Sequence, residues 1–77
     1  MGVKGQVTTN PAGIEWKDKR YDYTSGSLDY AGFSLVLGAA TDAGDLWKVW
    51  KYTWSGENLT RVQGPVACNW DDRAASF

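Results

Sequence analysis

The 77-residue chain carries eight Lys and Arg against nine Asp and Glu, so its formal net charge is −1. This balance offers no electrostatic attraction to nucleic acid or to an anionic membrane surface, and neither partner is expected. A single cysteine excludes an intrachain disulfide, and the lack of histidine argues against a structural zinc site. We therefore expect a protein without a metal or a cofactor.

The small size of the chain limits how it can be stabilised. Ordering it costs roughly 115 kcal/mol at about 1.5 kcal/mol per residue, which a small core offsets only narrowly. Five Trp, four Tyr and two Phe supply much of the apolar area. Because neither a disulfide nor a metal is expected, we expect further stability from self-association or from docking on a larger body.

No segment of the sequence has the character of a membrane span or a secretory signal. The longest apolar run, residues 33–40, includes a serine and a glycine and is far shorter than the roughly twenty residues of a membrane-spanning helix. The amino terminus has no hydrophobic signal region. We expect an unprocessed soluble protein that is made in a cytoplasm.

Residues 1–13 predict an extended N-terminal arm, which precedes a small β domain at residues 14–77. The arm contains three glycines and a proline, and its main apolar residues are Val3 and Val7, so it cannot bury itself. Two interpretations remain open. The arm is either a frayed terminus or a segment that becomes ordered along another subunit.

Alternation of apolar and polar residues predicts two short strands, at residues 14–17 and 33–37. The second is the stronger candidate for a core strand, because Phe33, Leu35 and Leu37 share one face between two bounding glycines. The charged residues that follow the first strand predict a solvated bend.

Residues 46–63 predict a β-hairpin around which the rest of the chain is arranged. Its first run is rich in Trp, Tyr, Val and Thr, which suit a half-buried strand, and residues 55–58 read Ser-Gly-Glu-Asn, which suits a turn. The tryptophan spacing also fits a helix, but this composition and the following glycine favour a strand. Gly64 and Pro65 predict the end of the second strand.

The first strand of this hairpin is apolar on both faces. Trp50, Tyr52 and Trp54 share one face, and Trp47 lies opposite with Val49. In so small a domain, one face is expected to meet the core and the other a neighbouring subunit. Two C-terminal aromatics are expected to dock the tail on the core or on a neighbour. The candidate interface residues are Trp47, Trp50, Tyr52, Trp54, Trp70 and Phe77.

The sequence shows no catalytic constellation. Asp71 and Asp72 are adjacent, so a strand would send them to opposite faces, and pairing of one of them with Arg73 is the simpler expectation. Cys68 has no histidine to activate it and reads as a small core residue. We expect a protein that is not an enzyme and has no catalytic residues. A small carbohydrate-binding module, with the aromatic side chains of the hairpin as a platform for sugar rings, is an alternative that their exposure decides.

Several short motifs occur in a distinctive order along residues 21–76. They are Tyr-Ala-Gly at 30–32, Ala-Ala-Thr at 39–41, the tryptophan-rich run at 47–56, Leu-Thr-Arg at 59–61 and Trp-Asp-Asp-Arg-Ala at 70–74. This order resembles small proteins encoded among the virion genes of tailed bacteriophages. The closing Trp-Asp-Asp-Arg-Ala after the hairpin is the most specific part of the resemblance.

The resemblance implies a non-enzymatic virion structural protein that is β-rich, present in many copies and homotrimeric. It implies that the partners are further copies of the chain and a major capsid protein or another virion protein. The function that we expect is capsid decoration or cementing, or anchoring of a fibre to the head. A tail or tail-fibre-associated structural protein is the alternative within this class. Together, residue pattern and resemblance predict an all-β fold: a small single domain of short antiparallel strands with a central tryptophan-rich hairpin and the extended arm.

Overall fold

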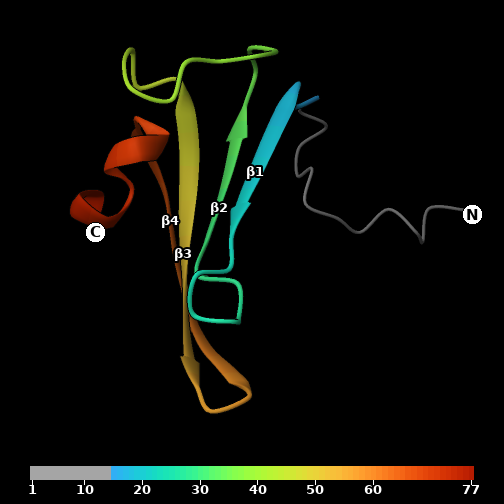
Figure 1. Ribbon diagram of the computed structural model, residues 1–77, viewed down its shortest axis with the longest axis vertical. Helices are drawn as coiled ribbons and strands as arrows, with labels where there is room; N and C mark the ends of the chain where they lie inside the picture. Colours follow the sequence, from blue (N-terminus) through green and yellow to red (C-terminus); the bar gives the residue numbers. More distant parts are fainter. Residues whose placement is uncertain (1–14) are drawn as a thin grey trace, which may run out of the picture.

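A four-stranded antiparallel sheet with strand order β1-β2-β3-β4 forms the body of the protein in a computed structural model, which describes residues 15–77 (Figure 1). Two short 3-10 helices, η3 and η4, follow the last strand, and residues 15–77 contain no α-helix. The predicted all-β class is confirmed, whereas the predicted arm at residues 1–13 lies outside the described residues. The elements are β1 (Asp18–Asp22), β2 (Tyr30–Ser34), β3 (Trp47–Ser55), β4 (Asn58–Cys68), η3 (Trp70–Asp72) and η4 (Ala74–Ser76).

The predicted hairpin is present as β3 and β4, and it is longer than expected. Ser55 pairs with Asn58 across a two-residue turn that begins with Gly56 at φ 61°. The expectation that the chain leaves the sheet at Gly64 is wrong, because β4 continues to Cys68. The pairing between β3 and β4 shifts register by one residue near Gly64, whose φ is 125°, and the two strands pair again beyond it.

The predicted core strand at residues 33–37 is displaced in the structure. Strand β2 ends at Ser34, whose hydroxyl oxygen accepts a hydrogen bond from the backbone N–H of Val36 at 3.1 Å. This side-chain bond closes a local turn in place of the next ladder position. Leu37, which alternation placed in the core, is therefore 79% exposed.

The first strand is also shifted, from the predicted residues 14–17 to Asp18–Asp22. Its position is fixed by pairing with β2, from Asp18 opposite Ser34 to Asp22 opposite Tyr30. Strand β1 lies at the edge of the sheet, where charged side chains are common because they remain in water. The charged run therefore forms a strand rather than the expected bend.

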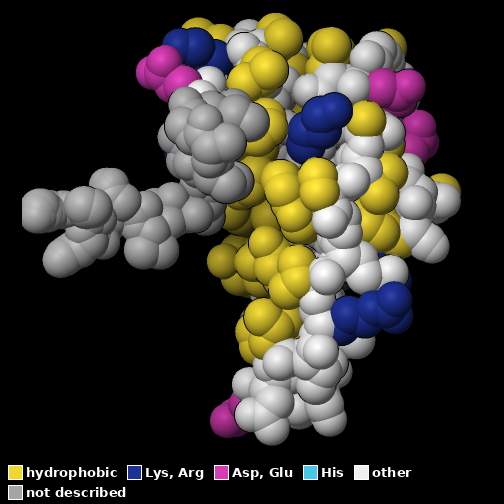
Figure 2. Space-filling view, turned by 180° about the vertical axis from the view of Figure 1, so that it is seen from behind, with side chains coloured by type: hydrophobic (Ala, Val, Ile, Leu, Met, Phe, Trp, Pro, Cys, Tyr) yellow, Lys and Arg dark blue, Asp and Glu magenta, His cyan; other side chains and the backbone are white. Residues whose placement is uncertain are grey.

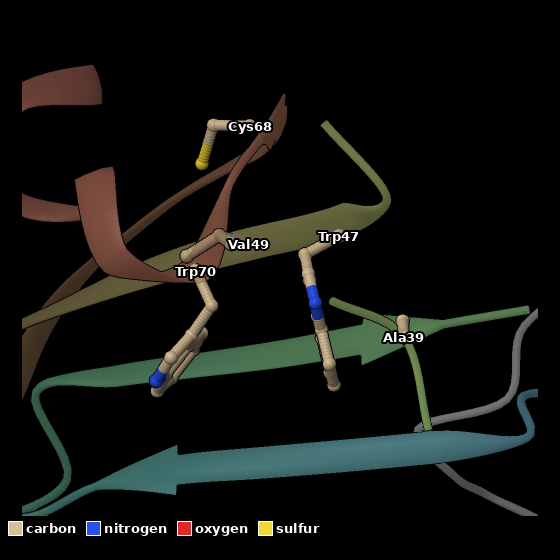
Figure 3. Packing of buried hydrophobic residues seen from close by; sticks show 5 residues of the cluster. All are labelled: Ala39, Trp47, Val49, Cys68 and Trp70. Carbon is tan, nitrogen blue, oxygen red and sulfur yellow. The ribbon is translucent and has the colours of Figure 1, made fainter. Parts of the chain in front are cut away.

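The main core lies on one face of the sheet, which we call the capped face because η3 and η4 cover it. Trp47 and Val49 of β3 are fully buried there, and Cys68 and Trp70 pack against them (Figure 3). The indole Nε1 of Trp47 donates a hydrogen bond to the carbonyl oxygen of Ala40 at 3.0 Å. The core thus joins β3, the end of β4, the loop before β3 and the C-terminal cap.

Gly32 allows the cap to approach β2 closely. A Cβ placed on this residue would lie 2.7 Å from two ring carbons of Trp70 and 3.3 Å from the ring of Trp47. The two indole rings, whose centroids are 6.1 Å apart, occupy the space that a side chain would take. Glycine is therefore needed here for packing rather than for backbone conformation.

A salt bridge ties the cap to the far edge of the sheet. Nε and Nη2 of Arg73 each lie 3.0 Å from Oδ2 of Asp22 at the end of β1. The expected pairing of Arg73 with Asp71 or Asp72 is wrong, because the structure brings together residues 51 positions apart. The link therefore closes the molecule between its first strand and its C-terminal segment.

Both partners of this salt bridge are held by further contacts. The guanidinium of Arg73 lies 4.4 Å from the ring centroid of Trp70 and 5.8 Å from that of Tyr30. Oδ1 of Asp22 accepts hydrogen bonds from the hydroxyl and the backbone N–H of Thr24. The hydroxyl bond of Thr24 does most to lower the pKa of Asp22 below its ordinary value of 3.8, the backbone bond and Arg73 add to this, and burial opposes it.

Asp22→Asn is expected to lower the free energy of unfolding by about 1–3 kcal/mol near neutral pH, since it removes a hydrogen-bonded charge pair. The folded-state pKa of Asp22 is depressed, so its contribution is present above the unfolded value and is lost as pH falls through the folded value. Urea unfolding from about pH 6 to about pH 2 measures this, and the variant should show a flatter acid limb. Asp42→Asn, in an exposed loop, is the matched control, and parallel acid limbs for Asp22→Asn and the wild type would contradict the assignment.

Candidate interaction surface

The face opposite the cap, which we call the open face, carries a continuous row of apolar side chains. In antiparallel strands, residues that pair directly point to the same face of the sheet. Phe33 pairs with Lys48, and Ala31 pairs with both Tyr21 and Trp50. These pairs place all five side chains on one face, at the upper end of the sheet, which is the end away from the hairpin turn. The apolar stripe of the open face consists of Tyr21, Phe33, Trp50, Tyr52, Trp54, Leu59 and Val62.

The upper part of the stripe is an aromatic cluster centred on Phe33. The ring centroid of Phe33 lies 5.2 Å from that of Trp50, 5.7 Å from that of Trp16 and 6.2 Å from that of Tyr21. Tilted and edge-on pairs at these separations stabilise one another beyond their area burial. Phe33 is buried by these contacts, whereas Tyr21 remains half exposed at the edge of the cluster.

The lower part of the stripe lies on the hairpin, which extends beyond the short strands β1 and β2 (Figure 1). Tyr52 pairs with Val62, and Trp54 pairs with Leu59. Val62 and Leu59 are 49% and 47% exposed. The residues on the other side of the same hairpin are polar: Lys51, Thr53, Arg61 and Gln63. The hairpin is therefore amphipathic, with its apolar side on the open face.

Two interruptions of the β4 ladder place its apolar residues on the open face. The register shift between Val49 and Lys51 brings Val62 opposite Tyr52, and the shift between Thr53 and Trp54 brings Leu59 opposite Trp54. Without the first shift Gln63 would lie opposite Tyr52, and without the second Thr60 would lie opposite Trp54, because each shift changes the pairing by one residue. Both shifts thus exchange a polar side chain for an apolar one.

Contacts with the β1–β2 loop hold the hairpin in place. The indole Nε1 of Trp54 donates to the carbonyl oxygen of Leu28 at 2.7 Å, and the backbone N–H of Tyr52 donates to that of Asp29 at 2.9 Å. These two hydrogen bonds fix the side chain of Trp54 and the backbone of Tyr52 before any partner binds.

Burial raises the pKa of the Tyr52 phenol, and the neighbouring Tyr21 adds to this rise.

No second layer covers the open face within residues 15–77, since both 3-10 helices pack on the capped face. Figure 2 shows hydrophobic side chains gathered in a column along one side of the molecule toward the end that carries the hairpin. Large exposed apolar stripes of this kind mark sites of interaction on soluble proteins.

The structure divides the six candidate interface residues into two groups. Trp50, Tyr52 and Trp54 lie on the open face and are half-buried, so they offer contact area. Trp47 and Trp70 are 0% and 6% exposed and belong to the core of the chain's own domain, so they offer little area to a partner. Phe77, at the C-terminus, is half-buried on the capped face.

That sixth residue, Phe77, contacts the sheet rather than open solvent. Its ring centroid lies 6.0 Å from that of Tyr30, and it packs against the main core. The expectation that the tail docks through Trp70 and Phe77 is confirmed for the core of the chain's own domain.

Sequence reasoning missed four members of the apolar stripe and one residue that packs beside it. Tyr21 and Phe33 join the stripe through the β1–β2 register, and Trp16 packs beside them. Leu59 and Val62 are three positions apart, so simple alternation puts them on opposite faces. The register shift between Thr53 and Trp54 brings them to one face, and no glycine or proline marks it in the sequence.

Residues 15–77 contain no pocket and no group of three or more His, Cys, Asp or Glu side chains that could hold a metal ion. Cys68 is a free thiol and is buried in the core, as expected. This part of the chain also has no helix with the length and apolar character that a membrane crossing requires.

Comparison with known protein families, curated proteins and solved structures gives no match to this chain. The fold and the surface nevertheless define a class: a small all-β domain with a single sheet, capped on one face and apolar on the other.

Proposed function

We propose that this protein is a non-enzymatic structural component of a tailed-bacteriophage virion, which decorates or cements the capsid or anchors a fibre to the head. The observation that carries the proposal is the apolar stripe on the open face, which no second layer covers within residues 15–77. The bacteriophage assignment rests on the resemblance of residues 21–76 to small virion proteins. The stripe supplies the physical means, which is packing against another protein surface.

An antiparallel sheet that is packed on one face can leave its other face in water, and that other face is then usually polar. The open face here is apolar instead, so a partner that packs on it removes the exposed parts of Tyr21, Leu59 and Val62 from water. The half-buried indoles of Trp50 and Trp54 add large contact area at little conformational cost, because the protein already holds them.

The proposed partners are further copies of the chain and a major capsid protein or another virion protein. The homotrimer implied by the resemblance stays a prediction. A tail or tail-fibre location is the alternative within the same class, and the same packing surface would serve it.

Locating the protein on particles tests this proposal. Purified virions are separated into heads and tails, and mass spectrometry measures the protein in each fraction. Enrichment in heads, together with heat-labile capsids when the protein is missing, is the expected result. Enrichment in tails would favour the alternative, and absence from both fractions would contradict a virion role.

Val62→Asp is expected to weaken association of the protein with its partners by about tenfold or more, because it places a charge within the apolar stripe. Sedimentation velocity over a dilution series measures self-association. Thr53→Asp is the matched control, since Thr53 is exposed on the polar side of the same hairpin. Equal weakening by both variants would show that the open face is not the contact.

A carbohydrate-binding module is the second candidate, favoured by the row of half-buried aromatic side chains Trp50, Tyr52 and Trp54 on the open face. Trp47 cannot belong to such a platform because it is buried. Titration of the intrinsic tryptophan fluorescence with a panel of neutral and acidic sugars separates the two functions. A saturable change that Trp54→Ala removes would favour the module.

A further inference from the structure

We propose that a second copy of this chain covers the open face in an antiparallel arrangement, with a twofold axis near Tyr52. This inference rests on the proposed function only in taking the open face as the packing surface. It adds the identity of one partner and its orientation, and it differs from the homotrimer that the resemblance implies.

The two ends of the stripe carry opposite charges. Lys19 and Lys48 both pair with Phe33, so the two lysines flank the stripe at its upper end, and both are exposed. Glu57 occupies the exposed turn at the other end of the hairpin. Figure 2 shows a basic side chain beside the upper part of the hydrophobic column and an acidic one at the lower tip.

The separation of these charges selects an orientation for two packed copies. From Lys48 to Glu57 the strand and turn extend about 25–30 Å, several times the distance over which exposed charges interact strongly at physiological salt. In an antiparallel pair, Glu57 of each copy meets the two lysines of the other. A parallel pair, or three copies bundled around a threefold axis through the stripe, would instead gather the lysines together.

The apolar rows also match in the antiparallel arrangement. Tyr52 lies about midway between the charged ends, so an axis there sets Tyr52 and Val62 against the same residues of the second copy. The row of Trp54 then meets the row of Trp50. An isologous contact of this kind is self-complementary and closes after two copies, as most symmetric dimers do.

The other charges of the hairpin do not cancel this pattern. Lys51 pairs with Gln63 and Arg61 pairs with Thr53, which places both cations on the side opposite the stripe. The stripe therefore has two lysines at one end and the acidic turn residue Glu57 beyond its other end. Such charges contribute more to orientation than to affinity, because exposed ion pairs are individually weak.

A charge-exchange experiment on the full chain tests the arrangement. Glu57→Lys, and separately Lys19→Glu combined with Lys48→Glu, are each expected to weaken self-association about tenfold, since each places like charges together at both ends of the pair. The exchanged variant, with all three changes in one chain, should restore wild-type association. Sedimentation velocity over a dilution series provides the dissociation constants. Arg61→Glu, a charge reversal on the opposite side, is the control and should leave association unchanged.

The outcomes separate this inference from the proposed function. A wild-type dimer that is weakened by each charge reversal and restored in the exchanged variant supports the antiparallel pair. If the charge-reversal variants associate like the wild type while Val62→Asp does not, the open face is the contact and the antiparallel orientation is wrong. A trimer, or a chain that stays monomeric at high concentration, overturns the pair, whereas detection of the protein on virions is unaffected by either result.

Discussion

Trp47→Ala is expected to leave the chain at or below the limit of stable folding. Removing a fully buried indole costs about 3–5 kcal/mol, and domains of this length have a total stability of roughly 4–12 kcal/mol. Trp47 is 0% exposed and forms the centre of the capped face. Its loss also leaves the carbonyl of Ala40 without its indole donor and removes the ring against which Trp70 packs.

Urea unfolding followed by circular dichroism measures this effect. Leu37→Ala is an informative control because alternation in the sequence placed Leu37 in the core, whereas the structure exposes 79% of it. That variant should change the free energy of unfolding by less than about 0.5 kcal/mol. A larger cost for Leu37→Ala than for Trp47→Ala would mean that Leu37, rather than Trp47, lies in the core.

The hairpin was predictable because its determinants are local. A run of β-branched and aromatic residues, a Ser-Gly-Glu-Asn turn and a period of two are all contained in residues 46–63. The same period correctly separated Trp47 and Val49 from Trp50, Tyr52 and Trp54. It did not reveal which of the two faces is buried, because the C-terminal cap that buries Trp47 folds back from beyond the hairpin.

The remaining errors concern pairing between distant segments. Strand β2 begins three residues earlier than predicted because its partners β1 and β3 extend along residues 30–34, and a serine hydroxyl ends it. The salt bridge of Arg73 joins residues 51 positions apart, so no local pattern indicates it. The members of the stripe contributed by β4 depend on two register shifts, which alternation cannot anticipate.

Gly64→Ala is expected to destabilise the fold by about 2–4 kcal/mol, the combined effect of backbone strain and steric conflict. Gly64 has a φ of 125°, a region that residues with a side chain rarely adopt. A Cβ there would lie 2.6 Å from the carbonyl oxygen of Val49 and 3.1 Å from the Cα of Trp50. Both are backbone atoms of β3, so neither can move without disturbing the ladder.

Gly38→Ala isolates the strain from the conflict, because Gly38 also has a positive φ, of 69°, but no described atom within 4 Å of its ideal Cβ. We expect it to cost about 1 kcal/mol, well below the cost at Gly64. The Gly64→Ala variant also tests the packing surface, since the register shift at Gly64 turns Val62 toward the open face. If Gly64→Ala folds by straightening the ladder, a one-residue slip moves Val62 to the polar side and self-association should fall together with stability. A Gly64→Ala protein with wild-type stability and association would show that this register shift does not shape the packing surface.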